Sequence, residues 1–248
     1  MKISVITVCC NSQATIERSL QSVVAQQWPE VEHIVIDGGS TDGTLAILER
    51  FRPHLAVLVS EPDKGIYDAM NKGLARATGD VVCFLNADDQ YANATVLAQV
   101  AQQMRTHQLD ALVADVGFFK PDKPMRMTRR YRSDRFSPQH LSWGWMPAHP
   151  GLFLTREVVQ RVGQFKTDYR IAGDYEYVVR TFHGHDLHYK HLPSVVVNMQ
   201  AGGVSNSSWR NRLILNREVV RACNENGINT NLFKILAKYP IKLLELMF

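Results

Sequence analysis

Two acidic residues and an amide follow directly on a short apolar run. Residues 81–85 (Val-Val-Cys-Phe-Leu) are too few for a helix and favour a strand buried on both faces; Asn86, Asp88 and Asp89 come next. Adjacent carboxylates repel each other and lose hydration at a sheet edge, and a divalent cation with oxygen ligands relieves both costs. One interpretation of the pattern is therefore a divalent cation at Asp88 and Asp89. An equally weighted alternative is that one of them caps the helix expected over 93–104.

A further carboxylate stands at the start of a later helical segment. Asp174 follows Gly173, and the apolar face of the segment continues through Val178, Val179 and Phe182. An aspartate at a helix amino terminus is most often a cap. It can also act as a general base, because a carboxylate beside a substrate hydroxyl can take the proton as a new bond forms.

Polar residues also follow the strand expected over 31–36. Asp37 at the strand end can accept hydrogen bonds from a base or ribose, and Gly38 and Gly39 let the backbone approach a ligand closely. The glycine spacing differs from that of the dinucleotide-binding GxGxxG fingerprint.

Asp68 and Asn71 stand three positions apart on the helix expected over 66–75, so they share one helix face. One interpretation is that this face lines the same crevice. The commoner alternative is a helix whose polar side faces solvent.

Alternating strand and helix segments position these side chains. Strands are expected over 2–8, 31–36, 55–60 and 81–85, and helices over 12–25, 45–51 and 66–75, with Asn11 or Ser12 capping the first helix. This α/β alternation predicts a parallel sheet with right-handed crossovers. Ligands of such sheets bind at the carboxyl ends of the strands, where Asp37, Asp88 and Asp89 stand.

The rhythm changes after residue 109. A strand is expected over 111–119, a basic stretch over 120–135, an irregular aromatic loop over 143–151, a strand over 152–155 and a helix over 156–162. Trp143 and Trp145 of the loop either stack on a sugar ring or fill core. The histidines between 183 and 191 are irregularly spaced, which favours surface residues over a zinc site.

Composition indicates one sizeable domain with an appendage. The chain has 248 residues, 45% hydrophobic and 21% charged, which is ordinary for a soluble globular protein. The four cysteines lack metal-binding spacing and are expected to be reduced packing residues. Basic residues concentrate over 120–135 and 204–248, which indicates phosphorylated ligands or an anionic membrane surface, or else a solvated face.

The motifs and their order along the chain resemble those of the family 2 glycosyltransferases, which have the GT-A fold. The matching segments are 4–8 (Ser-Val-Ile-Thr-Val) with Asn11, 36–44, 71–73 before Gly79-Asp80, 85–89, which looks like the DXD segment, and Asp174 in the place of the acidic base motif. The segment 61–73 is most similar to the branch that builds bacterial exopolysaccharides such as colanic acid.

The resemblance implies a Rossmann-like, mostly parallel sheet flanked by helices, and inverting transfer of a sugar from a UDP- or GDP-sugar to a saccharide hydroxyl. It implies Asp174 as the catalytic base and Mn²⁺ or Mg²⁺ at Asp88 and Asp89. The residues implied in donor binding are Thr7, Val8, Asn11, Asp37, Gly38, Asp68, Asn71, Asn86 and Asp88.

Three positions depart from the family pattern. Gly38 stands where a second acid usually contacts uracil, Asn86 stands where the DXD segment begins with Asp, and Gly173 replaces a common Glu. The identity of the base is therefore open, while metal binding is expected to survive through Asp88 or Asp89.

The expected organisation is a glycosyltransferase domain over 1–205, with a nucleotide-binding half (1–105) and an acceptor half (106–205), followed by a helical extension over 206–248. Lysines four apart on the apolar segment 231–248, which Pro240 interrupts, indicate an amphipathic helix. We expect it to lie on the inner membrane near a lipid-linked acceptor, or to form a dimer or packing contact. The loop 201–206 is expected to close over the nucleotide.

The predicted protein is cytoplasmic, peripheral on the inner membrane and without a nucleic-acid partner. A rival enzyme is a nucleotidyltransferase that makes NDP-sugars, which would carry a glycine-rich basic loop in place of Cys9-Cys10-Asn11-Ser12. A rival from another class is a catalytically silent carbohydrate-binding subunit, against which the retained Asp88, Asp89 and Asp174 argue.

Overall fold

The structure, a computed structural model, describes residues 1–120, 123–200 and 208–237. In these residues, one nine-stranded sheet runs in the order β3-β2-β1-β4-β8-β6-β9-β5, with β7 paired to β6. The strands are β1 (Ile3–Cys9), β2 (Val31–Asp37), β3 (Val57–Ser60), β4 (Val81–Phe84), β5 (Gln90–Tyr91), β6 (Ala111–Lys120), β7 (Lys123–Tyr131), β8 (Leu152–Thr155) and β9 (Tyr189–Gln200). The α-helices are α1 (Ile16–Val24), α2 (Thr44–Phe51), α3 (Ile66–Leu74), α4 (Val96–His107), α5 (Arg156–Val162), α6 (Gly173–Phe182), α7 (Trp209–Glu225) and α8 (Leu232–Leu236). Short 3₁₀ helices are η1 (Arg52–His54), η2 (Pro138–Trp143) and η3 (His149–Gly151).

The first four strands form a parallel half-sheet. β1 pairs in parallel with β2 on one side and with β4 on the other, and β2 pairs in parallel with β3. Every residue of β1 and β4 is buried, as in parallel strands with both faces covered by helices. The parallel arrangement predicted from the strand and helix alternation is confirmed.

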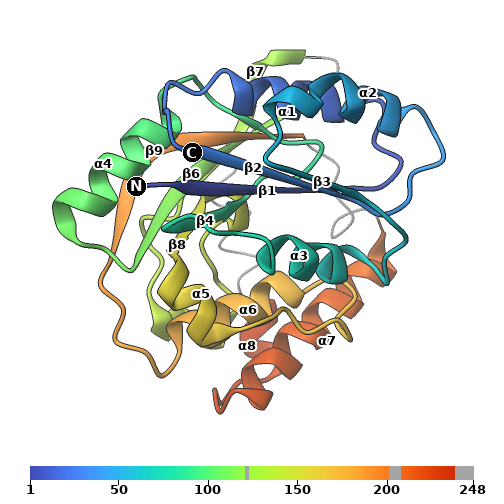
Figure 1. The fold of residues 1–248 in the computed structure, drawn as a ribbon. Coiled ribbons are helices and arrows are strands. Elements are labelled where there is room, and N and C mark those ends of the chain that lie inside the picture. The colour runs from blue at the N-terminus through green and yellow to red at the C-terminus, as the bar shows by residue number, and fades with distance from the viewer. Residues whose placement is uncertain (121–122, 201–207, 238–248) are drawn as a thin grey trace.

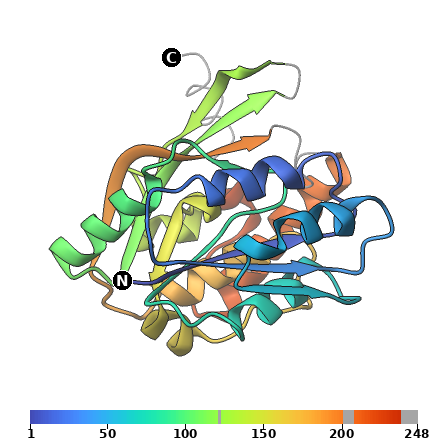
Figure 2. The ribbon, with the colours of Figure 1, turned by 45° about the horizontal axis from the view of Figure 1, so that its top comes forward.

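The second half of the sheet is mixed. β8 runs antiparallel to β4 and β6, β7 antiparallel to β6, and β5 antiparallel to β9, whereas β9 runs parallel to β6. The hairpin of β6 and β7 extends beyond the body of the sheet (Figure 2). This half continues the sheet past β4 through β8.

Helices cover both faces of the sheet. α1, α2 and α4 lie on one face, and α3, α5, α6 and α7 lie on the other (Figure 1). Alternate residues of β1 serve the two cores: Ile3 and Val5 pack with α4, while Ile6 and Val8 pack with the α3 and α6 side. Three buried apolar clusters therefore hold the sheet between its helical layers.

Element boundaries differ from the predicted ones where local hydrogen bonds or Pro intervene. α1 begins at Ile16 with Thr15 as its N-cap residue, so neither Asn11 nor Ser12 caps it. α4 begins at Val96 because the Asn93 side chain accepts hydrogen bonds from the N–H and hydroxyl of Thr95, which form a turn before the helix.

Two further segments differ. β3 begins at Val57 because η1, which contains Pro53, occupies the preceding residues. Within the basic stretch 120–135, for which no strand was predicted, β7 forms as the antiparallel partner of β6.

The carboxyl-terminal helices pack on the main core. Val219, Ala222 and Cys223 of α7 are buried in the same apolar cluster as α6, and Ile235 of α8 is fully buried against η2. The loop 201–206 lies outside the described residues, as does most of the predicted amphipathic segment 231–248. Among the helices of the described ranges, none is both long and apolar enough to cross a membrane.

All four cysteines are free thiols. Cys9, Cys83 and Cys223 are buried, as expected for packing residues, whereas Cys10 is exposed at the end of β1.

Candidate active site

The carboxyl ends of β1, β2 and β4 meet at one edge of the sheet. Cys9 at the end of β1 lies beside Asp37 at the end of β2, and the N–H of Leu85 donates to the carbonyl of Ile6. The segments that follow these strands, 10–15, 38–43 and 85–89, therefore emerge side by side. They carry four of the nine predicted donor-binding residues, which are Asn11, Gly38, Asn86 and Asp88.

Asn11 joins the first two of these segments. Its backbone is left-handed (φ 49°), its side-chain oxygen accepts a hydrogen bond from the N–H of Thr41 at 2.9 Å, and its N–H donates to the Ser40 hydroxyl at 2.7 Å. Asn tolerates this conformation better than most residues, which is a local reason for an Asn here. The side chain is exposed at the sheet edge.

The carboxylate of Asp37 is engaged in hydrogen bonds within the protein. Its carboxylate accepts hydrogen bonds from the N–H and hydroxyl of Ser40 and from the hydroxyl of Ser60, and the side chain is fully buried. Burial opposes ionisation, but these hydrogen bonds outweigh it and lower the pKa of Asp37. Asp37 therefore shapes the 37–40 turn, and the structure does not present it to a base or ribose as the sequence suggested.

Asp63 takes up the space over Gly38. A Cβ at Gly38 would lie 2.3 Å from Oδ2 of Asp63, so a larger residue fits there only if Asp63 moves. The carboxylate of Asp63 also accepts a hydrogen bond from the N–H of Gly65 at 2.8 Å. An acid from the loop after β3 thus stands where the family pattern places a second acid after β2. Sequence analysis assigned Asp63 no role.

The segment after β4 has the chemistry of a cation site. The carboxylate of Asp89 is buried, and burial together with the charge of Asp88 holds the pKa of Asp89 well above its usual value. Oδ1 of Asn86 is buried without a hydrogen-bond partner among the described residues, while its amide nitrogen faces Asp89 at 3.4 Å. An orphaned oxygen, a destabilised carboxylate and the exposed Asp88 form an oxygen donor set that suits Mg²⁺ or Mn²⁺.

Neither aspartate caps α4, whose N-cap residue is Thr95. The alternative that one of them caps this helix is therefore wrong. In the described ranges, no group of three or more His, Cys, Asp or Glu side chains gathers to hold a metal by itself.

Asn71 and Thr7 are structural in this fold. The Asn71 side chain donates to the carbonyl of Phe165 at 2.9 Å and accepts from its N–H at 2.8 Å, so it binds the loop after α5. The Thr7 hydroxyl lies 3.0 Å from Nε2 of His33, within the sheet. Val8 is a core residue of the α3 and α6 side. The structure therefore does not bring these side chains to the crevice.

The side chain of Asp68 contacts the loop before α3 and Lys72 of the same helix. Its carboxylate accepts a hydrogen bond from the N–H of Lys64 at 3.0 Å and lies 3.8 Å from the ammonium of Lys72. This fixes the segment that carries Asp63, so the contribution of Asp68 to the site is indirect.

Asp174 is the second residue of α6 and is half-buried. Its carboxylate accepts a hydrogen bond from the N–H of Tyr175 at 2.8 Å. Desolvation by burial raises the pKa of Asp174 to about 6, with a further upward contribution from the charge of Glu218. A carboxylate whose pKa lies close to neutrality is suited to accept a proton at physiological pH.

Gly173 permits a close contact that the common Glu of the family would prevent. The phenol of Tyr67 in α3 accepts a hydrogen bond from the N–H of Gly173 at 2.8 Å and donates to the carbonyl of Ile171 at 2.7 Å. A Cβ on Gly173 would lie 2.6 Å from the Tyr67 ring. The glycine at this position therefore allows the Asp174 loop to bind to α3 through Tyr67.

Aromatic packing connects the two acidic regions. Phe84, at the end of β4, meets Phe165 edge-on at a centroid distance of 5.4 Å, and Phe165 stacks on Tyr67 at 6.0 Å. The strand that leads to Asn86 and the helix that binds the Asp174 loop therefore contact the same aromatic cluster, formed by Phe84, Phe165 and Tyr67.

His149 is a further candidate to which sequence analysis assigned no role. Its ring stacks on Phe84 at 5.3 Å, burial lowers its pKa to about 4, and both ring nitrogens are buried without a partner among the described residues. Buried polar groups normally have hydrogen-bond partners. The single signal in the sequence was its position at the end of the aromatic loop 143–151.

Comparisons with known proteins agree with this architecture. Residues 4–163 match the family model of "Glycosyl transferase family 2". The chain is 32% identical over 208 residues to a PGL/p-HBAD biosynthesis glycosyltransferase of Mycobacterium bovis, covering 82% of this chain and 79% of that one.

Solved structures are similar in fold. Staphylococcus aureus TarS 1–349, in complex with UDP-GlcNAc, has a TM-score of 0.71 and 20% identity over 90% of this chain and 66% of that chain; a longer TarS chain is covered to 40%. The mannosyltransferase PcManGT from Pyrobaculum calidifontis, in complex with GDP-Man and Mn²⁺, has a TM-score of 0.70 and 24% identity over 95% of this chain and 68% of that chain. The fold is GT-A, and the chain belongs to glycosyltransferase family 2.

Proposed function

We propose that this protein transfers a sugar from a nucleotide-diphosphate sugar to a hydroxyl of a saccharide acceptor, with inversion at the anomeric carbon. The observation that carries the proposal is Asp174, a half-buried carboxylate whose pKa is raised to about 6 beside α3. Relatives in the same fold are described with UDP-GlcNAc and with GDP-Man, which supports a UDP- or GDP-sugar donor.

The proposed reaction requires the carboxylate of Asp174 to lie beside the acceptor hydroxyl. Asp174 takes the proton of the acceptor hydroxyl while the oxygen of that hydroxyl attacks the anomeric carbon. The bond from that carbon to the diphosphate breaks on the opposite face, the glycosidic bond forms, and the nucleoside diphosphate leaves. Displacement from the opposite face inverts the configuration.

Asp88 and Asp89 would hold Mn²⁺ or Mg²⁺, with Asn86 supplying an amide oxygen. When bound, such a cation neutralises the charge that develops on the leaving diphosphate. The orphaned oxygen of Asn86 and the buried carboxylate of Asp89 support this assignment. Because protein ligands are few, oxygens of the donor's diphosphate would complete the coordination.

Recognition of the base is proposed to involve Asp63. Its carboxylate lies over Gly38, the position at which the family pattern has the acid expected to contact uracil. The exposed Asn11 and the backbone of Gly38 flank the same place. His149 is proposed to bind a polar group of the donor sugar or acceptor, since its nitrogens lack partners within the described chain.

The proposed acceptor is lipid-linked, and the enzyme is proposed to touch an anionic membrane through α7 and α8. Trp209 and Phe233 are 68% and 86% exposed, and Leu213, one turn after Trp209, is also exposed. Arg210, Arg212 and Lys234 stand among them, so the surface joins apolar and cationic side chains as interfacial helices do.

The test is transfer measured with a panel of UDP- and GDP-sugars and with Mn²⁺ present or chelated. Asp88→Ala and Asp89→Ala are expected to lose metal-dependent donor turnover, whereas Asp174→Asn is expected to bind donor and lose transfer. Asp186→Asn, at an exposed aspartate before β9, is the matched control and should transfer like wild type.

Other outcomes would identify another function. Pyrophosphate-dependent formation of an NDP-sugar indicates a nucleotidyltransferase. Saccharide binding without turnover of any donor indicates a silent binding subunit. Unchanged transfer by Asp174→Asn removes the assignment of the base.

A further inference from the structure

We propose that Glu218 of α7 is a positioning residue for Asp174, holding the loop that leads into the catalytic base from the side opposite to Tyr67. The inference rests on the proposed function, because it concerns the residue assigned there as the base. It makes α7 part of the catalytic apparatus, although α7 lies outside the segment matched by the family model.

Glu218 is bound to three consecutive amides of this loop. Its carboxylate accepts hydrogen bonds from the N–H groups of Arg170, Ile171 and Ala172 at 2.8, 2.9 and 2.8 Å. Consecutive amides that converge in this way form an anion-binding concavity, and bonds to a charged acceptor are about twice as strong as neutral ones. One side chain therefore fixes the backbone up to the residue before α6.

Tyr67 completes the attachment. Its phenol accepts the next amide, that of Gly173, and binds the carbonyl of Ile171. Every N–H from Arg170 to Gly173 thus has a side-chain partner, from α7 on one side and from α3 on the other. Asp174 follows directly, so its backbone has little freedom to move.

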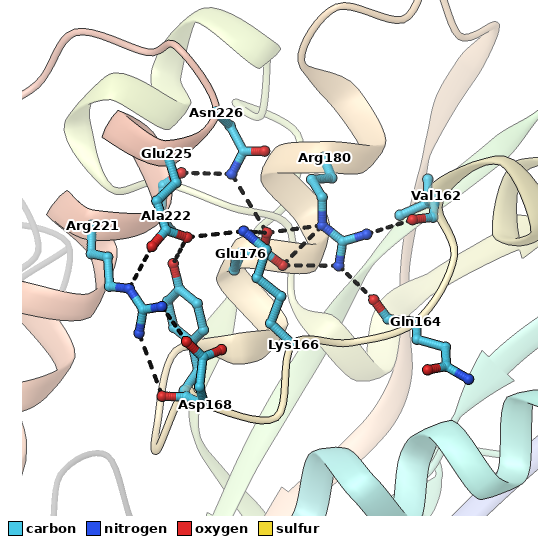
Figure 3. Close-up of polar contacts among 11 residues, drawn as sticks. Val162, Gln164, Lys166, Asp168, Glu176, Arg180, Arg221, Ala222, Glu225 and Asn226 are labelled. Carbon is cyan, nitrogen blue, oxygen red and sulfur yellow. Dashed lines mark hydrogen bonds and ion pairs between the residues drawn. The ribbon is translucent and has the colours of Figure 1, made fainter.

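α7 is itself fixed to the segment before the loop (Figure 3). Arg221 forms an ion pair with Asp168, and Glu225 accepts a hydrogen bond from Lys166 at 2.9 Å. Lys166 also reaches Glu176 of α6 at 3.1 Å. These contacts, with the buried inner face of α7, make the helix a firm support for the carboxylate of Glu218.

The charge of Glu218 also acts on Asp174. Within the described part of the chain, the titratable groups that act on Asp174 or are acted on by it are the Tyr67 phenol from α3 and the Glu218 carboxylate from α7. A nearby negative charge disfavours ionisation, and Glu218 contributes in this sense to the raised pKa of Asp174. The same residue therefore places the base and keeps its proton affinity high.

The experiment compares Glu218→Gln, Glu218→Ala and Glu49→Gln in pH profiles of kcat and of kcat/KM for the acceptor. Glu218→Gln keeps a carbonyl acceptor but removes the charge, so the acid limb of the profile moves to lower pH. Glu218→Ala releases the loop, and kcat falls on the order of a hundredfold with the donor KM unchanged, as for a misplaced catalytic group.

Glu49→Gln is the matched control, because it removes an exposed carboxylate of α2, a helix on the opposite face of the sheet from α3, α6 and α7. Its acid limb should stay in place. An unchanged acid limb in Glu218→Gln together with wild-type kcat in Glu218→Ala overturns the proposal, and so does an equal acid-limb shift in Glu49→Gln. Failure of the proposed function is recognised separately, because Asp174→Asn would then retain transfer.

Discussion

The phenol of Tyr67 and the backbone of Gly173 are joined by a hydrogen bond of 2.8 Å, across a contact that excludes a Cβ at Gly173. Tyr67 belongs to α3, the helix after the loop that carries Asp63, whereas Gly173 immediately precedes Asp174. Together with the Tyr67–Ile171 bond, this contact attaches the loop that leads to the proposed base to the half of the sheet that ends in Asp88 and Asp89. Its removal should therefore affect the chemical step more than donor binding.

Tyr67→Phe is expected to lower kcat while the donor KM changes little, because the variant loses both hydrogen bonds to the Asp174 loop but keeps the ring that stacks on Phe165. We expect a loss of about 1–3 kcal/mol in the free energy of unfolding. Urea denaturation and steady-state kinetics measure the two effects. Tyr177→Phe is the control, since the buried Tyr177 hydroxyl has no partner among the described residues. A similar loss in both variants would contradict the assigned role.

Asp174→Asn is expected to be more stable than wild type at pH 8 while losing transfer. The raised folded-state pKa means that the folded protein holds this proton more tightly than the unfolded chain. Wild type therefore loses stability as the pH rises from the ordinary value of 3.8 to about 6, and Asn avoids this loss. Thermal melts from pH 4 to 8 measure the difference, which should shrink toward pH 4. Asp186→Asn should show no such pH-dependent gain.

His149→Phe is expected to retain or raise stability and to reduce turnover. The substitution keeps an aromatic ring against Phe84 and removes two buried nitrogens without partners, each of which costs about 1–3 kcal/mol when unsatisfied. Thermal unfolding and donor kinetics are measured together. Full activity in a stable variant would show that neither nitrogen contacts substrate.

Gly38→Ala is expected to weaken donor binding because its Cβ would displace Asp63. Asp63→Ala removes the obstacle, so the double variant should lose less than the sum of the two single variants, with a coupling of at least about 0.5 kcal/mol. The affinities of wild type, the two single variants and the double variant for UDP and GDP are measured by calorimetry. Strictly additive losses would mean that the two positions act independently.

Trp209→Ser and Phe233→Ser are each expected to reduce binding to anionic liposomes, on the order of tenfold, because in the proposed membrane contact the wild-type side chain is buried among the lipids. Leu45→Ser, at an exposed leucine of α2 on the opposite face of the sheet, should bind like wild type. Sedimentation with vesicles measures the effect. If the same substitutions instead dissolve a dimer in solution, this face is a contact between two copies.

Local sequence determined the parallel half of the fold. Apolar runs such as 81–85 and the helical spacing between them specify strands and helices by short-range physics, and parallel strands necessarily share a carboxyl edge. Asn86, Asp88 and Asp89 could therefore be located before any coordinates. The basic stretch gave no such signal, because β7 forms by pairing with β6 and its charged residues lack apolar alternation.

Tertiary structure decided which polar residues are free to act. Asp37 and Asn71 looked like ligand contacts, yet Ser60 and the Phe165 backbone, distant in sequence, occupy them. The roles proposed for Asp63, Tyr67, His149 and Glu218 depend on surroundings that only folding supplies. Side-chain type states what chemistry a residue can perform, whereas its hydrogen-bond partners and burial, set by long-range packing, decide whether that chemistry is available.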